Sequence, residues 1–214
     1  PVAYRYSELF PHHFGAGVMG FTRPSAVAFW GLTFSPYRGL FFHSPFLLLA
    51  IPGIAAWART RRLGPELAVV VIGPALLLIF LSGMATWAGG NAIGPRHLTT
   101  ALPLMVLPIA ALLASTGPRL RAAFRALALL SAGVIWLLTL AGQAYPPETA
   151  GFPLRDHALP LVLAGDFARN AGMALGLSGW WSVAPLLIVM IGGYVWLRRE
   201  SSPRGARQPR GESR

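Results

Sequence analysis

The sequence predicts an all-α integral membrane protein with about five transmembrane helices and short interfacial helices on the outer face. Three observations support this prediction. Hydrophobic residues make up 54% of the chain and charged residues only 12%, which is far from the balance of a soluble domain. Five mostly apolar windows approach the roughly 20 residues that a helix needs to cross a bilayer core about 30 Å thick. Arginines cluster in the connections between these windows.

The windows span about residues 40–58, 67–87, 98–115, 126–144 and 180–197. The third is short and contains Pro103 and Pro108, which membrane helices tolerate where neighbouring groups satisfy the freed carbonyls. Four helices are therefore expected within residues 40–144, and the fifth at 180–197.

Arginine placement predicts the orientation, because cytoplasmic loops carry the excess of Lys and Arg. All eighteen basic residues are arginines. Twelve fall on one side of the membrane: Arg59, Arg61, Arg62, Arg119, Arg121, Arg125, Arg198, Arg199, Arg204, Arg207, Arg210 and Arg214. Six fall on the other: Arg5, Arg23, Arg38, Arg96, Arg155 and Arg169. This alternation puts the amino terminus outside and the carboxyl terminus in the cytoplasm, and the abundant Ala, Gly, Pro and Arg indicate a GC-rich bacterium, hence its cytoplasmic (inner) membrane.

Two segments are expected on the outer face. Residues 1–39 contain an apolar stretch at 26–34 that is too short to span, so a short interfacial helix is predicted there. Residues 145–179 form an outer loop, for which we expect an amphipathic helix with Asp166 and Arg169 as neighbours on its surface. Residues 198–214 are rich in Ser, Pro, Gly and Arg, and a disordered basic cytoplasmic tail is predicted.

The charge pattern and the start of the chain limit the partners. A net charge of +11 on a soluble protein would point to nucleic acid. Here the arginines lie in short clusters between apolar runs, so the lipid bilayer is the expected partner and nucleic acid is not. The chain starts at Pro1 without a signal-peptide pattern. An outside amino terminus then requires upstream membrane helices, which predicts a missing N-terminal transmembrane half.

The hairpin at residues 87–97 is the first candidate site. Pro95 suits the first turn of the following helix, so Arg96 and His97 would lie at a helix amino terminus, where free N–H groups and the helix dipole favour an anion. A phosphate at the membrane surface is the expected occupant, with Asn91 in the same hairpin. The alternative is a glycine-rich turn whose arginine extends to the lipid headgroups.

The second candidate site is the turn at residues 35–39, which contains Tyr37 and Arg38, with His43 and Ser44 one turn into the helix that follows. Polar groups within a spanning segment are costly and often functional. The alternative is that His43 and Ser44 lie near the interface and are simply hydrated.

Metal binding and carboxylate catalysis find little support in this chain. Histidines and carboxylates that could meet on the outer face are Glu8, His12, His13, Asp156 and His157. Adjacent histidines point in different directions and no zinc-type spacing is present, so no metal site is predicted. The outer loops contain no adjacent carboxylates and no Asp-x-Asp, so the catalytic base is unknown. Cysteine is absent, which excludes disulfides and thiolate ligands.

Two ordered motifs within residues 1–115 resemble a family. The motifs are Phe34-Ser35-Pro36-Tyr37-Arg38-Gly39-Leu40-Phe41-Phe42-His43-Ser44-Pro45, followed by Pro52-Gly53, and Trp87-x-Gly89-Gly90-x-x-x-Gly94-Pro95-Arg96-His97-Leu98 with Pro103 beyond. They resemble the carboxyl-terminal half of bacterial multi-spanning glycosyltransferases of the GT-C type, relatives of the dolichyl-phosphate-mannose protein mannosyltransferases and of the aminoarabinose transferases that act on lipid A. His97 stands where relatives often have tyrosine.

The resemblance implies transfer of a sugar from a polyprenyl-phosphate carrier to an acceptor on the outer side of the membrane. It makes Arg96, His97, Asn91, Arg38 and Tyr37 the expected substrate-binding residues. The family's catalytic carboxylate lies in its first outer loop, which would be upstream of Pro1, as would any divalent metal cofactor. Two alternatives stay open: a transporter or lipid flippase, and a noncatalytic membrane scaffold or incomplete gene product.

Overall fold

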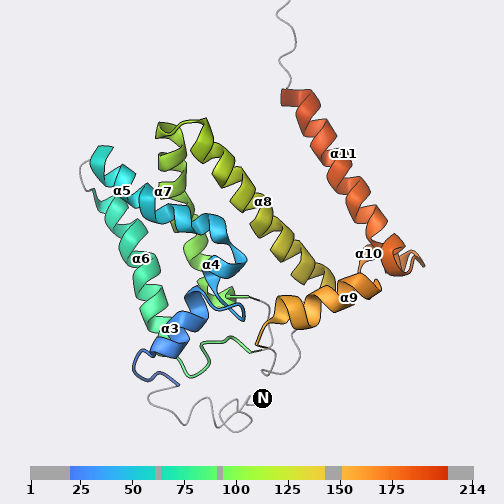
Figure 1. The fold of residues 1–214 in the computed structure, drawn as a ribbon, viewed down its shortest axis with the longest axis horizontal. Helices are drawn as coiled ribbons and strands as arrows, with labels where there is room; N and C mark the ends of the chain where they lie inside the picture. Colours follow the sequence, from blue (N-terminus) through green and yellow to red (C-terminus); the bar gives the residue numbers. More distant parts are fainter. Residues whose placement is uncertain (1–19, 61–63, 91–93, 143–150, 202–214) are drawn as a thin grey trace, which may run out of the picture.

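The computed structural model describes residues 20–60, 64–90, 94–142 and 151–201 (Figure 1). Its helices are α3 (Ala26–Thr33), α4 (Leu40–His43), η1 (Pro45–Leu49), α5 (Ala50–Thr60), α6 (Pro65–Ser82), η2 (Arg96–Ala101), α7 (Leu102–Ser115), α8 (Pro118–Ala141), η3 (Leu154–Ala158), α9 (Leu159–Ala164), α10 (Ala171–Ala174), η4 (Gly179–Val183) and α11 (Ala184–Ser201). Over these residues the chain forms no strand, and Phe21 and Met84 make an isolated β-bridge. The predicted all-α fold class is confirmed.

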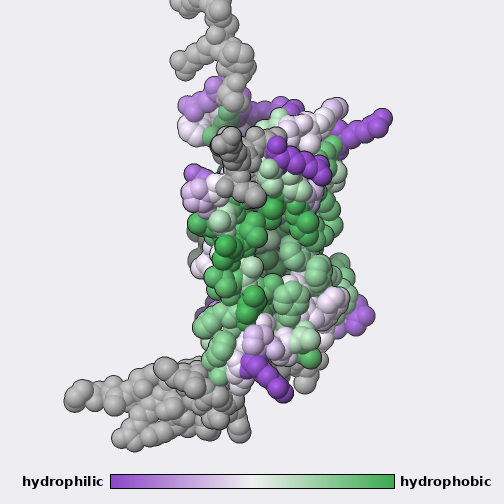
Figure 2. Space-filling view, turned by 90° about the vertical axis from the view of Figure 1, so that its left-hand side faces the viewer, coloured by the Kyte–Doolittle hydropathy of each residue, from purple (hydrophilic) through white to green (hydrophobic). Residues whose placement is uncertain are grey.

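Four stretches of helix are long and apolar enough to cross a membrane: Pro65–Ser82, Arg96–Ser115, Pro118–Ala141 and Gly179–Glu200. Each overlaps one of the last four predicted windows. On α6, the side chains of Val69, Ile72, Leu76 and Ile79 recur at helical spacing and are more than half exposed. An exposed apolar stripe of this kind would promote aggregation in water, whereas it is favourable in contact with lipid. Figure 2 shows apolar residues forming a belt across the middle of this side of the molecule, with polar residues at both ends.

The first predicted window is broken and does not match the four spans in length. α4 ends at His43, and Pro45 starts the 3₁₀-helix η1, because a proline ring disfavours helical geometry in the preceding residue, here Ser44 at φ −137° and ψ 67°. The apolar helix that follows, Pro45–Arg59, is shorter than the spans. In Figure 1, α5 runs across the upper parts of α6 and α7.

α5 and α7 pack backbone to backbone at Gly53. A Cβ atom on Gly53 would collide with the carbonyl group of Pro108, so only glycine permits this approach. Pro108 and Ile109 on α7 are buried. The first window is therefore held within the helix packing at this point.

The helix ends fall into two groups, as the arginine pattern predicts. The C-terminal ends of α5, α7 and α11 and the N-terminal ends of α6 and α8 lie at one end of the molecule (Figure 1). The C-terminal ends of α6 and α8 lie at the other, together with α3 and α9. Arg59, Arg119 and Arg198 thus belong to the first end, and Arg96 and Arg155 to the second.

α8 begins earlier than expected. The predicted window began near residue 126, with Arg119, Arg121 and Arg125 in a connecting turn; that placement is wrong, because the helix begins at Pro118. Proline at the first helical position is favourable and arginine is a good helix former, so the first two turns form with their charges near the helix end.

The predicted outer helices form only in part. α3 matches the short helix expected at residues 26–34 and lies against α6. In the second outer segment, the helical stretch 154–164 ends at Gly165, whose φ of +71° is left-handed. Asp166 and Arg169 lie beyond this end and outside any helix, so their prediction as neighbours on a helix surface is wrong.

Candidate functional site

The two predicted clusters meet in the structure, through Arg38. Arg38 is 1% exposed. Its Nη1 donates to the Gly94 carbonyl oxygen at 3.4 Å, and its Nη2 donates to the Gly90 carbonyl oxygen. The turn at residues 35–39 is thereby joined to the glycine-rich hairpin, and Arg38 has a structural role that the sequence did not indicate.

Tyr37 connects the same turn to the second outer segment. Its hydroxyl oxygen accepts a hydrogen bond from Arg38 Nη2 at 3.3 Å, and the guanidinium carbon lies 4.6 Å from the centre of the tyrosine ring. The ring packs against Leu138 of α8 and Ala158 of η3, which are both fully buried. Tyr37 therefore positions Arg38 and is itself only partly accessible.

The His43 ring is buried beside the hairpin. Its Nδ1 lies 2.8 Å from the Gly39 carbonyl oxygen, which can only accept, so Nδ1 carries the proton. Among the described residues its Nε2 has no hydrogen-bond partner, although the side chain is 1% exposed. The Cδ2 edge of the ring faces Gly94, 3.9 Å from where a Cβ atom would stand.

Arg96 and His97 fold back over Gly89. Gly89 has a φ of +74°, and a Cβ atom there would lie 3.2 Å from Arg96 Nε and 3.1 Å from His97 Nε2. Arg96 is exposed and His97 half-buried, so the guanidinium of Arg96 is the more accessible of these groups.

The expected set of free N–H groups at the start of a helix is not present. Residues 96–101 form the 3₁₀-helix η2, and Pro95 before it has no N–H. The Arg96 N–H donates to the Gly94 carbonyl at 3.0 Å and the Leu98 N–H to the Pro95 carbonyl at 2.8 Å. Pro95 is the central residue of the tight turn between Gly94 and Arg96, at φ −84° and ψ 60°. Positive charge at this site therefore comes from the arginine side chains, not from a helix terminus.

Four of the predicted residues cannot be placed relative to this site. Asn91 lies outside the described residues, as do Glu8, His12 and His13. Within the described part of the chain, no three His, Asp or Glu side chains come together as a metal site would require.

The carboxylate of Asp156 forms a salt bridge with an arginine side chain. This carboxylate accepts from Arg155 Nε at 2.6 Å on an exposed surface, and this hydrogen bond holds the pKa of Asp156 below its usual value.

One contact at the site was not predicted from the sequence. The rings of Phe42 and Phe152 meet edge to face with centroids 5.5 Å apart. This contact brings the second outer segment beside α4, one residue from His43. Nothing in the spacing of two aromatic residues 110 positions apart predicts that they pair.

The fold and the site define a class of protein: an all-α membrane protein with a cationic cluster, Arg38 and Arg96, and the neighbouring His97 at one end of its apolar helices. Comparisons with protein-family models, curated proteins and solved structures found no match. The function has to be argued from the site itself.

Proposed function

We propose that the cationic cluster binds the phosphate of a polyprenyl-phosphate-linked sugar, and that the chain belongs to a GT-C type glycosyltransferase of a bacterial cytoplasmic membrane. The observation that carries the proposal is the junction at Gly94, where Arg38 and the Arg96 backbone both donate to one carbonyl. This junction gathers positive charge where apolar helices end. A ligand with an anionic head and a long apolar tail suits that position.

Arg96 is the residue we propose to contact the phosphate. Its side chain is exposed, and within the described residues its guanidinium makes no hydrogen bond or ion pair. Arg38 differs, because it is buried and bonded to two hairpin carbonyls. Arg38 is therefore proposed to hold the hairpin in place, and Arg96 to bind.

Gly89 supports the same assignment. Because it lacks a side chain, Arg96 Nε and His97 Nε2 both lie over its backbone, about 3 Å from the vacant Cβ position. The two nitrogens are therefore held on the same side of the hairpin. A phosphate, which offers several acceptor oxygens, could bond to both.

The orientation is part of the proposal. The arginine-rich end formed by the start of α8 and the end of α11 would face the cytoplasm, and the site would face outward. In this orientation the sugar is transferred outside, as the resemblance implies.

The charge distribution disfavours a transporter. A transporter places charges or broken helices near the middle of the bilayer. In the four described spans the charged residues are near the ends: Glu66, Arg96, Arg119, Arg121, Arg125, Arg198, Arg199 and Glu200. A scaffold would need the bond between Arg38 and Gly94, and in it Arg96 would serve only as an anchor to the lipid headgroups, without affinity for a polyprenyl phosphate.

A pair of ligands tests the proposal. Equilibrium binding to the protein in nanodiscs is measured with a polyprenyl phosphate and with the uncharged polyprenol of the same chain length. One or two charge-assisted hydrogen bonds predict at least about tenfold tighter binding of the phosphate. Equal affinities for the two compounds would contradict a phosphate site.

A further inference from the structure

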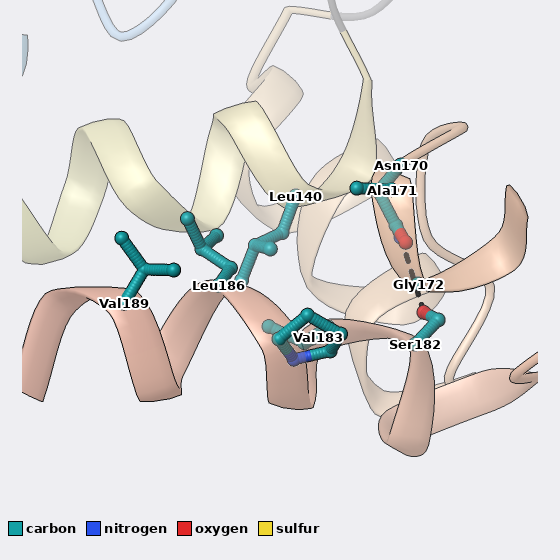
Figure 3. A pocket seen from close by; sticks show the side chains of 9 residues that line it. Leu140, Asn170, Ala171, Gly172, Ser182, Val183, Leu186 and Val189 are labelled. Atoms are coloured by element: carbon teal, nitrogen blue, oxygen red, sulfur yellow. Dashed lines mark hydrogen bonds between the residues drawn. The ribbon is translucent and has the colours of Figure 1, made fainter. Parts of the chain in front are cut away.

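An apolar groove lies between the end of α8, α10 and the start of α11 (Figure 3). Its volume is about 290 Å³. Carbon surface from Leu140, Gly172, Val183, Pro185, Leu186 and Val189 makes up most of the lining. In Figure 3 the side chains of Leu140 and Leu186 lie next to each other between the two helices.

The polar side chains at one end of the groove are satisfied by protein groups. Asn170 Nδ2 donates to Ser182 Oγ at 3.1 Å, and Ser182 Oγ donates to the Gly179 carbonyl at 2.7 Å. Asn170 Oδ1 accepts from the Met173 N–H at 3.1 Å, which caps α10. A ligand therefore meets an apolar surface, and an apolar ligand fits it best.

The surroundings place the groove at the depth where lipid chains meet their headgroups. Residues 186–200 of α11 are all exposed, so along this stretch the described chain covers the helix only in part. At the start of α11, Trp180 is 59% and Trp181 75% exposed, which is typical of residues at a membrane interface. Arg169 precedes Asn170 of the groove and is exposed as well.

We propose that this groove binds one acyl chain of a bilayer phospholipid, with the phosphate of that lipid near Arg169. The volume is at the lower limit of small-molecule sites, which begin at about 300 Å³, so it accommodates part of one chain. A whole helix of a second protein, about 10 Å across with its side chains, occupies more than this volume in a single turn. Arg169 supplies a cation for a phosphate at the level of the tryptophans.

The groove is separate from the proposed carrier site. None of the residues that line the groove belongs to the turn at 35–39 or to the hairpin at 87–97. α10 and α11 contribute no residue to the proposed carrier site. The inference therefore does not depend on the proposed function. The carrier's own polyprenyl chain is the competing occupant, and the experiment distinguishes it.

Photolabelling tests the groove directly. The protein is placed in nanodiscs that contain a phospholipid with a diazirine on one acyl chain, irradiated, digested and mapped by mass spectrometry. Labels are expected on Leu140 and Val189 at least about tenfold above those on Leu129 and Leu130, which are 72% and 57% exposed on α8 and do not line the groove. Uniform labelling of all exposed apolar residues would overturn the proposal.

Two neighbouring residues provide matched variants. Val189 lines the groove and is 72% exposed, whereas Ile188 is 70% exposed and does not line it. Val189→Trp should reduce labelling of Leu140 to the level of Leu129, and Ile188→Trp should leave it unchanged. Both positions are exposed, so neither variant disturbs packed structure. Equal labelling of Leu140 in the two variants would refute the assignment.

A third arm uses a polyprenyl phosphate with a diazirine in its chain. The phospholipid probe should label Leu140 several-fold more efficiently than this compound at equal concentration. Preferential labelling by the polyprenyl chain would assign the groove to the carrier and overturn the proposal. Lipid adducts on Leu140 in nanodiscs that hold one copy of the protein, but none in nanodiscs that hold two copies, would do the same in favour of a second copy of the chain.

Discussion

Arg38 and Gly94 are joined by a hydrogen bond from the guanidinium Nη1 to the carbonyl oxygen, 3.4 Å long, across 56 positions of sequence. Two segments that are separated by α5 and α6 in the chain, the turn at residues 35–39 and the hairpin, thus form one unit. The Arg96 backbone N–H donates to the same carbonyl, so the position of the proposed ligand-binding arginine depends on this junction.

Replacing Arg38 should destabilise the protein. Arg38→Ala removes a charged donor from the buried Gly94 carbonyl and the part-buried Gly90 carbonyl, and the loss of charge-assisted hydrogen bonds predicts a decrease of about 2 to 4 kcal/mol in stability. Thermal unfolding in detergent measures it. Arg23→Ala, at an exposed arginine, is the control and should leave the midpoint unchanged. Equal midpoints for both variants would show that the junction does not hold the fold.

Gly89 and Gly90 form a matched pair. Both have a left-handed backbone, at φ +74° and +67°, so alanine should cost about 1 to 2 kcal/mol at either position. A Cβ at Gly89 also crowds Arg96 Nε and His97 Nε2, whereas at Gly90 nothing lies within 4 Å. Gly89→Ala should therefore weaken polyprenyl phosphate binding more than Gly90→Ala at similar stability. The opposite order would place the ligand away from Arg96.

The contact between α5 and α7 predicts a stability difference between two helical glycines. Gly53→Ala should destabilise the protein, because its Cβ would collide with the Pro108 carbonyl. Gly133 on α8 has open space around it, so Gly133→Ala should be neutral or stabilising by up to about 1 kcal/mol. Unfolding midpoints of the two variants are compared with the wild type. A tolerated Gly53→Ala would mean that α5 does not pack on α7 in this way.

The orientation predicts the outcome of reporter fusions. Fusions after Arg62, after Gly117 between α7 and α8, and after Arg199 should report the cytoplasm. Fusions at Gly90 and at Phe152 should report the outer side. A cytoplasmic signal at Gly90 would reverse the orientation and place the site on the wrong side for transfer outside the cell.

The sequence predicted the fold better than the site. Hydrophobic windows of near-membrane length reveal spanning helices because they depend only on local composition, and four of five windows became such helices. The first did not, since Pro45 breaks the helix and Gly53 allows α5 to pack on α7, a long-range contact that no local pattern shows.

The features of the site that the sequence did not predict also depend on how the chain folds back on itself. Arg38 and Arg96 were both predicted, but the bond from Arg38 to Gly94 depends on how two distant loops meet. The prediction of free N–H groups at Arg96 was wrong because Pro95, at φ −84° and ψ 60°, turns the chain so tightly that the Gly94 carbonyl accepts from the Arg96 N–H. The prediction that Asp166 and Arg169 are neighbours on a helix surface was wrong, because the helix α9 ends at Gly165, before Asp166.

The most direct test of a phosphate site at Arg96 is the affinity of a polyprenyl phosphate for Arg96→Ala and Arg155→Ala in nanodiscs. Losing a charge-assisted hydrogen bond of about 1.5 to 3 kcal/mol predicts roughly 10- to 150-fold weaker binding for Arg96→Ala. Arg96→Lys should restore only part, because lysine lacks the planar guanidinium. Arg155 is bonded to Asp156 on the surface, so Arg155→Ala should change the affinity little. Equal and small effects of the two alanine variants would contradict the account and reduce Arg96 to a headgroup anchor.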